Sequence, residues 1–183
     1  MILKINKIEY SKFLYTIFTY DYGIIKVGSK LNLCKTNKKH RWKPLDIWYM
    51  INFEISTMQW RSIHNIRNIQ ILSEFNFENK AFSKINNYLI LLNTILKNVP
   101  VWVSNYEIFK IIEKINKKND LDSIKYILAT LKVLDISWWL SVDGADKNVN
   151  KILKFINSNN IDKILKLSWI SDETESFLKT ITL

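Results

Sequence analysis

The strongest constraint on the fold is a change of hydrophobic period near residue 75. Before that point, apolar and polar residues alternate, as in the stretch DIWYMINFEIST at 46–57. A period of two is typical of a half-buried β-strand. After residue 78, apolar residues recur at intervals of three and four, which indicates amphipathic helices. The chain is therefore predicted to be α+β, with strands first and helices second.

The first 75 residues are expected to form five short strands. Gly23 follows the β-branched and aromatic run FLYTIFTY, where a hairpin turn needs a permissive residue. Too little chain separates the strands for crossover helices, so the prediction is an antiparallel sheet, closed or nearly closed as a small barrel. The expected strands lie within 3–8, 13–20, 22–29, 46–57 and 68–72.

The remaining residues are expected to form an α-helical bundle. Asp120 or Asp122 is a candidate N-cap for the helix expected within 120–136, and Asp172 with Glu175 resembles a capping box. These patterns predict two domains, 1–75 and 76–183. Clear helical periodicity covers 106–118, 120–136, 145–159, 160–168 and 171–183.

Positive charge is concentrated in the first domain. The formal net charge of the chain is +10, and no acidic residue occurs between Asp21 and Asp46. A local excess of this kind attracts phosphates more strongly than the same charge spread evenly. The basic residues of this interval are Lys26, Lys30, Lys35, Lys38, Lys39, Arg41 and Lys43.

This basic interval is the main candidate for a binding site. Tyr20, Tyr22 and Trp42 lie in or beside it, and flat rings can stack with bases. The seven basic residues and these three aromatic residues are the predicted nucleic-acid contacts. The alternative is an ordinary solvated loop whose rings anchor it to the core.

Catalytic motifs are missing from the sequence. Three glycines cannot build a phosphate-binding loop or a dinucleotide fingerprint, and neither G-x-S-x-G nor H-E-x-x-H occurs. Cys34 and His40 are separated by a spacing that matches no common zinc site. We therefore expect no enzyme activity, no cofactor and no metal.

Two further expectations concern partners and compartment. The stretch SWWLS could present Trp138 and Trp139 to a partner protein, although packing is the alternative for both rings. A single cysteine excludes an intrachain disulfide, and MILKINK lacks the apolar region of a signal peptide. No apolar run is long enough to span a bilayer. A cytoplasmic protein without membrane contact is expected.

Several segments together resemble the RecO family of bacterial recombination and repair mediators. YTIFTYDYGIIKV at 15–27 is similar to the family's strand–turn–strand, with Thr19, Tyr22 and Gly23 at the matching positions. The similarity continues through 43–56 and 66–75 and into helical segments at 87–92, 105–115 and 123–136. The chain departs from the family pattern in lacking the four-cysteine zinc site of many members.

The resemblance implies an oligonucleotide/oligosaccharide-binding (OB) barrel followed by a helical domain. It also implies binding of single- and double-stranded DNA, annealing of complementary strands and help in loading the RecA recombinase. The implied partners are RecR and the C-terminal tail of the single-stranded-DNA-binding protein, with no small-molecule substrate. Two alternatives remain: a helical scaffold module with incidental basic charge, and an RNA-binding OB protein.

Overall fold

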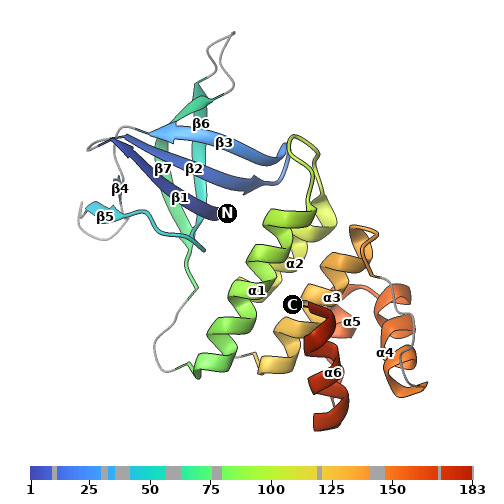
Figure 1. The fold of residues 1–183 in the computed structure, drawn as a ribbon. Helices are drawn as coiled ribbons and strands as arrows, with labels where there is room; N and C mark the ends of the chain where they lie inside the picture. Colours follow the sequence, from blue (N-terminus) through green and yellow to red (C-terminus); the bar gives the residue numbers. More distant parts are fainter. Residues whose placement is uncertain are drawn as a thin grey trace. The chain divides into compact units, whose positions relative to one another are not determined.

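The computed structural model divides the chain into two compact units. The sheet unit comprises Met1–Asn76 and Pro100–Phe109, and the helical unit comprises Phe77–Val99 and Lys110–Leu183. Strands come first and helices follow, which confirms the predicted α+β order (Figure 1). The structure describes residues 1–9, 12–29, 33–35, 42–56, 63–75, 80–118, 121–140, 147–168 and 170–182, with the backbone alone at 9, 33–35 and 42–44.

The described part of the sheet unit contains five long strands and two short ones. The long strands are β1 (Ile2–Glu9), β2 (Lys12–Thr19), β3 (Gly23–Ser29), β6 (Met50–Ser56) and β7 (His64–Ser73). β4 (Leu33–Lys35) and β5 (Trp42–Pro44) pair with each other inside the basic interval, where the sequence predicted no strand beyond residue 29.

The sheet is mixed, so the prediction of an all-antiparallel sheet was wrong. β1, β2 and β3 form an antiparallel meander and β6 pairs antiparallel with β7, but β7 runs parallel to β3 and β4. A parallel pair needs a connection of a dozen residues or more. Here the connection from Ser29 to His64 supplies that length, and its described residues include β4, β5 and β6.

The described strand ladders form an open sheet, not the closed or nearly closed barrel that the sequence predicted. The strand order is β1-β2-β3-β7-β4-β5, with β6 on β7, and no ladder joins β6 to β1. Two backbone hydrogen bonds bring the ends together: Ile2 N–H donates to Tyr49 O at 2.9 Å and Trp48 N–H donates to Ile2 O at 2.8 Å. Two bonds at one residue do not make a ladder.

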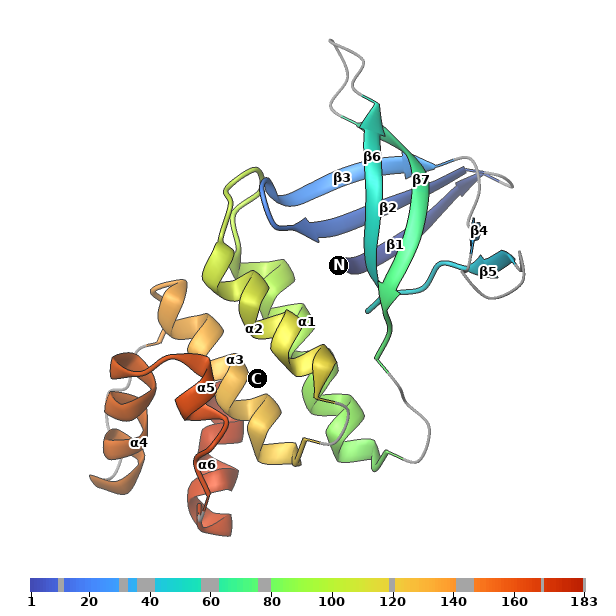
Figure 2. The same ribbon diagram turned by 180° about the vertical axis from the view of Figure 1, so that it is seen from behind.

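The core of the sheet unit lies between the β1–β3 meander and the β6–β7 pair. Figure 2 shows β6 and β7 crossing the meander steeply, as in packed sheets with crossed strands. Alternate residues of each strand point into this space. The buried cluster consists of Ile2, Tyr15, Ile17, Ile25, Val27, Leu45, Tyr49, Ile51 and Ile66.

The helical unit is arranged around α3, which packs against α1, α4, α5 and α6. α3 carries eight buried residues in fourteen, including Tyr126, Leu128 and Leu131, so it is apolar on nearly every side. The helices are α1 (Phe82–Asn98), α2 (Tyr106–Lys117), α3 (Ser123–Ile136), α4 (Lys147–Ser158), α5 (Ile161–Ile164) and α6 (Asp172–Thr182).

Two predicted helix caps differ from the structure. Asp122 stands at the N-cap of α3, but its side chain makes no capping hydrogen bond. At α6 the cap is Ser171, one residue before the predicted Asp172, because Ser171 Oγ accepts from Thr174 N–H at 3.3 Å. Within the described ranges, no helix combines the length and apolar character that a membrane span requires.

Candidate nucleic-acid interface

Part of the predicted basic interval lies within the described residues. Four predicted contacts, Lys30, Lys38, Lys39 and Arg41, lie outside the described residues. For Lys35, Trp42 and Lys43 the backbone alone is described: Lys35 lies opposite Trp42 and Cys34 opposite Lys43 in the β4–β5 hairpin. Whether these side chains share one face therefore remains a prediction.

Tyr20 and Tyr22 lie in the turn between β2 and β3. Their side chains are 48% and 53% exposed. The Tyr20 ring meets Tyr106 edge to face at 4.9 Å and Phe109 at 5.5 Å, so one part of this ring is occupied by α2. Tyr22 is the more accessible ring of the two predicted tyrosines.

Thr19 and Gly23 hold this turn closed. Thr19 Oγ1 donates to Gly23 O and accepts from Tyr22 N–H, each at 3.0 Å. Gly23 has a φ of +63°, a left-handed conformation that costs a residue with a Cβ about 1–2 kcal/mol. The sequence prediction of a turn glycine at this position is confirmed.

A distant piece of chain, the return segment at residues 100–105, packs against this hairpin. Trp102 N–H donates to Ile24 O at 3.1 Å, and Ser104 Oγ donates to Tyr20 O at 2.9 Å. A Cβ on Gly23 would overlap the backbone carbonyl of Val103, so the close approach requires glycine. The return segment thus covers the end of the β2–β3 hairpin.

The outer face of the meander carries a row of three aligned residues, here called the cationic row: Lys4, Thr16 and Lys26. Lys4 pairs with Thr16 across β1 and β2, and Thr16 pairs with Lys26 across β2 and β3. Directly paired residues point to the same face. Their neighbours Tyr15 and Ile25 point the other way, into the core.

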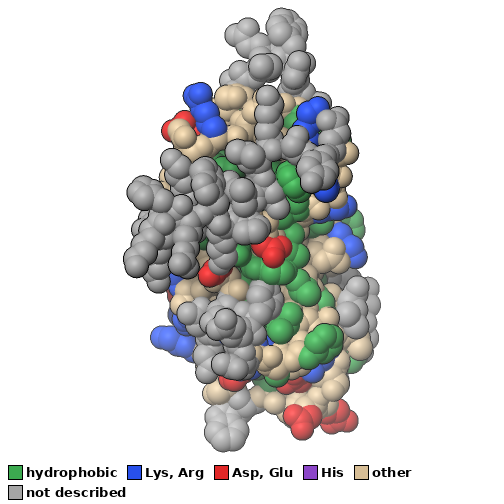
Figure 3. Space-filling view, turned by 90° about the vertical axis from the view of Figure 1, so that its left-hand side faces the viewer, with side chains coloured by type: hydrophobic (Ala, Val, Ile, Leu, Met, Phe, Trp, Pro, Cys, Tyr) green, Lys and Arg blue, Asp and Glu red, His purple; other side chains and the backbone are tan. Residues whose placement is uncertain are grey.

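The two lysines of the cationic row are available for an anion. Both are exposed, whereas Thr16 between them is 6% exposed. Neither ammonium group forms an ion pair with a carboxylate of the described residues. Two strand spacings place the lysine backbones about 10 Å apart. Figure 3 shows Lys and Arg side chains following one another along the upper right edge of the view.

The β6–β7 side of the sheet unit has a different charge balance. Arg67 Nε lies 3.3 Å from Glu54 Oε2, and both side chains are more than half exposed. This pair neutralises the arginine locally, so Arg67 adds little to an anion-binding surface. Among the described strands, the meander therefore presents the stronger unpaired positive charge.

Trp102 lies beside β3, which the sequence did not predict. Its side chain is 49% exposed, and its ring meets the His64 ring edge to face at 5.3 Å. His64 pairs with Val27 in the sheet, while the Trp102 backbone is bonded to Ile24. Because His64 pairs with the core residue Val27, the indole contacts a side chain on the face opposite to Lys26.

A shallow hollow of about 270 Å³ is lined by residues of the β2–β3 turn and of β6. Its wall contains aromatic rings from Tyr20, Tyr22, Phe53 and Phe109. Among the described residues that line it, Asp21 is the only one with a charged side chain, and this carboxylate would repel a phosphate. This hollow is less suited to a polyanion than the outer face of the meander.

The helical unit presents the two tryptophans predicted to bind a partner. Trp138 is 95% exposed and Trp139 is 67% exposed, so neither ring is core packing. Trp138 has a φ of +63° and ends α3: Trp139 N–H donates to Leu134 O and Trp138 N–H donates to Asp135 O. This is a Schellman motif with tryptophan at the position that glycine usually occupies.

Metal ligands do not cluster in the part of the chain that the structure describes: no group of three or more His, Cys, Asp or Glu side chains is placed to hold an ion.

Two sequence features could have pointed to the outer face of the meander. Lys4 lies at a polar position of an alternating strand, and Lys26 was already a candidate. No local signal in the sequence marked Trp102.

Comparison with protein-family models and with curated proteins finds no match for this chain.

Proposed function

We propose that the sheet unit binds nucleic acid without catalysing a reaction. The observation that carries the proposal is the cationic row, in which Lys4 and Lys26 flank Thr16 on one face without carboxylate partners among the described residues. Exposed ammonium groups on a rigid sheet can replace the counterions of a phosphate backbone. The exposed Tyr22 and Trp102 add flat rings on which bases can stack.

The biological role that best fits this proposal is that of a recombination mediator of the RecO type. An OB-fold is a five-stranded, partly open Greek-key barrel. The path β1-β2-β3-β7-β6, with hydrogen bonds from Ile2 to the chain entering β6, is compatible with such a barrel. Annealing of strands and recombinase loading, with RecR as a partner, are the activities that this role would include.

The test is fluorescence anisotropy with a labelled 20-nucleotide DNA strand of mixed sequence at several salt concentrations. We expect binding that weakens steeply with salt, because each neutralised phosphate releases counterions. Substituting Lys38, Lys39 and Arg41 together by glutamine should lower the affinity for all sequences alike. Binding that does not respond to salt would contradict the proposal. Competition with an RNA strand of the same sequence distinguishes the DNA-binding role from the RNA-binding alternative.

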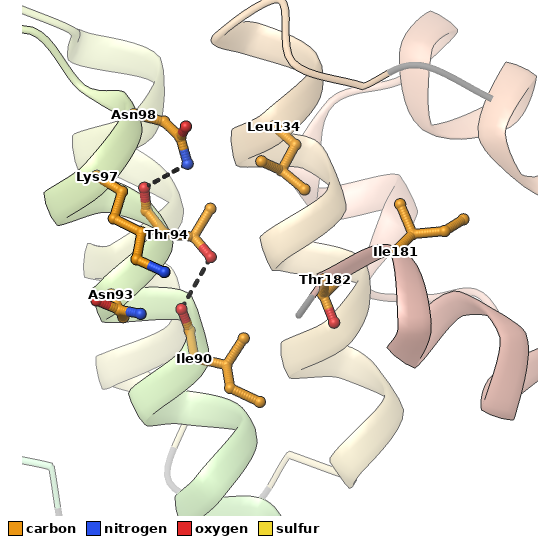
Figure 4. A pocket seen from close by; sticks show the side chains of 8 residues that line it. All are labelled: Ile90, Asn93, Thr94, Lys97, Asn98, Leu134, Ile181 and Thr182. Carbon is orange, nitrogen blue, oxygen red and sulfur yellow. Dashed lines mark hydrogen bonds between the residues drawn. The ribbon is translucent and has the colours of Figure 1, made fainter.

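A second candidate function is protein binding by the helical unit. Trp138 and Trp139 are exposed rings of this unit, and a pocket of about 200 Å³ lies between α1, α3 and α6. Figure 4 shows Ile90, Leu134 and Ile181 around this pocket, with the Lys97 side chain at its edge. Apolar walls beside one ammonium group suit an acidic segment with an apolar side chain, such as the tail of the single-stranded-DNA-binding protein.

The pocket proposal is tested by titrating a labelled acidic peptide with a C-terminal phenylalanine. Thr94 Oγ1 and Asn98 Nδ2 donate to carbonyls of their own helix, so Lys97 is the lining group with charge to offer. Lys97→Glu should abolish peptide binding, and the half-buried Lys84 on the same helix provides a charge-matched control variant, Lys84→Glu. Equal loss in both variants would show that general charge, not the pocket, attracts the peptide.

A further inference from the structure

We propose that β6 binds an extended segment of a partner protein as an additional strand on its free edge. The segment alternates apolar residues, which enter the hollow along β6, and carries a lysine or arginine that meets Asp21. Peptide recognition of this kind draws affinity from main-chain hydrogen bonds and specificity from pockets for alternate side chains. The inference goes beyond the proposed nucleic-acid binding, because no described residue that lines the hollow belongs to the cationic row.

β6 is an edge strand within the described part of the sheet. It pairs antiparallel with β7 on one side, and no described ladder occupies its other side. Ile2 bonds to Trp48 and Tyr49, which precede β6, and not to residues of β6 itself. An edge strand presents a row of N–H and C=O groups with which another chain can pair.

The hollow of about 270 Å³ follows this strand along its edge. Successive side chains of a strand point to opposite faces, so a hollow under one face would be lined by alternate residues only. Here consecutive residues of β6 line it, whereas β7 contributes Leu72 alone among the described residues. Phe18 and Thr19, at the end of β2, form another part of the wall. The lining residues of β6 are Met50, Ile51, Asn52, Phe53 and Ile55.

The chemistry of the hollow selects the kind of segment. Its described wall is largely apolar and aromatic, and Leu72 is 62% exposed there. Asp21 is exposed and forms no ion pair with a lysine or arginine of the described residues. Apolar walls beside an unpaired carboxylate are complementary to an apolar segment with a lysine or arginine, and they disfavour a polyanion.

The experiment uses the full chain and two labelled eight-residue peptides with blocked termini. Both alternate valine and threonine, which favour extended backbone, and they end in lysine or in glutamate at both ends. We expect the lysine peptide to bind about tenfold more tightly in fluorescence polarisation. The formal net charge of the chain is +10, so general attraction would favour the glutamate peptide instead. A preference for lysine therefore has to arise locally.

N-methylated peptides test the added strand without changing the protein. Neighbouring residues of a strand direct their N–H groups to opposite edges. Methylation of one central valine or of the threonine next to it should therefore weaken binding about tenfold in one peptide and leave the other unchanged. Hydrogen exchange followed by NMR should show slower exchange of alternate amides within β6 when the unmethylated lysine peptide is bound.

Variants of the chain locate the charge preference. Asp21→Lys should reverse the order of the two peptides, whereas Glu173→Lys makes the same change of charge at an exposed position of α6 and should leave the order unchanged. Lys4→Gln/Lys26→Gln, which alters the cationic row, should not weaken binding of the lysine peptide. Circular dichroism and thermal unfolding confirm that each variant is folded.

The outcomes keep this inference separate from the proposed function. Tighter binding of the glutamate peptide by the wild-type chain overturns it, as does the same response to both methylated peptides. Dimers in analytical ultracentrifugation, with β6 amides protected before any peptide is added, would assign the edge to a second copy of the chain and overturn it too. Failure of the chain to bind DNA overturns the proposed function and leaves peptide binding at β6 intact.

Discussion

At the scale of single residues, Gly23 is the position where the β2–β3 turn and the return segment most constrain the side chain. Its φ is positive, and an added Cβ would overlap the Val103 carbonyl. Gly23→Ala should therefore lower the free energy of unfolding by about 3 kcal/mol, combining the left-handed strain with overpacking. Urea denaturation followed by tryptophan fluorescence measures this change.

Gly28 provides the matched control for this substitution. A Cβ there would lie 3.5 Å from Asn65 Oδ1, an ordinary contact, and its φ is not positive. Because glycine in a strand is less favourable than alanine by about 0.5–1 kcal/mol, Gly28→Ala should leave stability equal or slightly higher. Equal destabilisation by both alanines would contradict the role given to the return segment.

Trp138 is a residue at which stability and binding are expected to respond in opposite directions. It occupies the left-handed position after α3 with 95% of the residue exposed, so it gains little from packing there. Trp138→Gly should raise the free energy of unfolding by about 1 kcal/mol. If the exposed ring binds a partner, the same variant loses that partner in a pull-down. A decrease in stability would show that the ring packs after all.

Burial of the Tyr88 hydroxyl should make the stability of the folded protein fall at alkaline pH. Its hydroxyl donates to Asn116 Oδ1 at 2.7 Å, and burial is the main cause that raises the pKa of this tyrosine above its usual value. The folded state keeps the proton while the unfolded chain releases it above about pH 10. Stability from this group is thus fully present below pH 10 and is lost as pH rises further, by up to about 1.4 kcal/mol per pH unit.

The pH prediction is tested by urea unfolding of wild type and Tyr88→Phe between pH 9 and pH 11. The variant should be less stable at pH 9, because Asn116 loses a donor, by about 1–2 kcal/mol. It should then lose less stability than wild type as pH rises. Parallel curves for the two proteins would show that this hydroxyl does not control the alkaline transition.

At the scale of elements, a charged network joins α3 to the end of α4. Lys132 Nζ donates to Asp135 Oδ2 at 2.8 Å and to the Ile156 carbonyl at 3.0 Å. Asn157 Nδ2 donates to Asp135 Oδ1 at 2.8 Å. The lysine and aspartate side chains are only 12% and 11% exposed. The network satisfies carbonyls at the C-terminus of α4, where cations are favourable.

Removing the cation from this network should lower the stability of the folded protein. Lys132→Met leaves a nearly buried Asp135 without its cation and should lower the free energy of unfolding by about 3 kcal/mol. The control is Lys117→Gln, which breaks the exposed pair of Lys117 with Glu113 and should change stability by less than about 0.5 kcal/mol. Circular dichroism at 222 nm during urea unfolding compares the two variants. Similar small effects would contradict the structural role of the network.

At the scale of the whole molecule, net charge and charge placement make different predictions for nucleic-acid binding. The double variants Lys4→Gln/Lys26→Gln and Lys151→Gln/Lys154→Gln each remove two positive charges and lower the formal net charge from +10 to +8. The second pair is exposed on α4. Only the first should reduce the salt dependence of DNA binding, by up to about two units of slope. Anisotropy titrations at several salt concentrations measure this slope, and equal slopes would mean that net charge alone attracts DNA.

The candidate site was predictable only in part. Lys26, Tyr20, Tyr22 and Gly23 could be selected from the sequence, because local charge and turn chemistry identify them. Lys4 became relevant only through its alignment with Thr16 and Lys26 across two strand pairs. Trp102 is separated from Lys26 by more than seventy residues. No local pattern encodes which strand a distant segment packs against, so its place beside β3 required the tertiary structure.

The sequence by itself determined the order of strands and helices, the turn at Gly23 and the positions of most helices. These features follow from hydrophobic period and backbone preference, which act over a few residues. Only the tertiary structure decided that β7 runs parallel to β3, that the described strands form an open sheet, and that the return segment joins the sheet unit. Pairing between distant strands depends on which arrangement buries the most apolar surface, and that is a property of the whole chain.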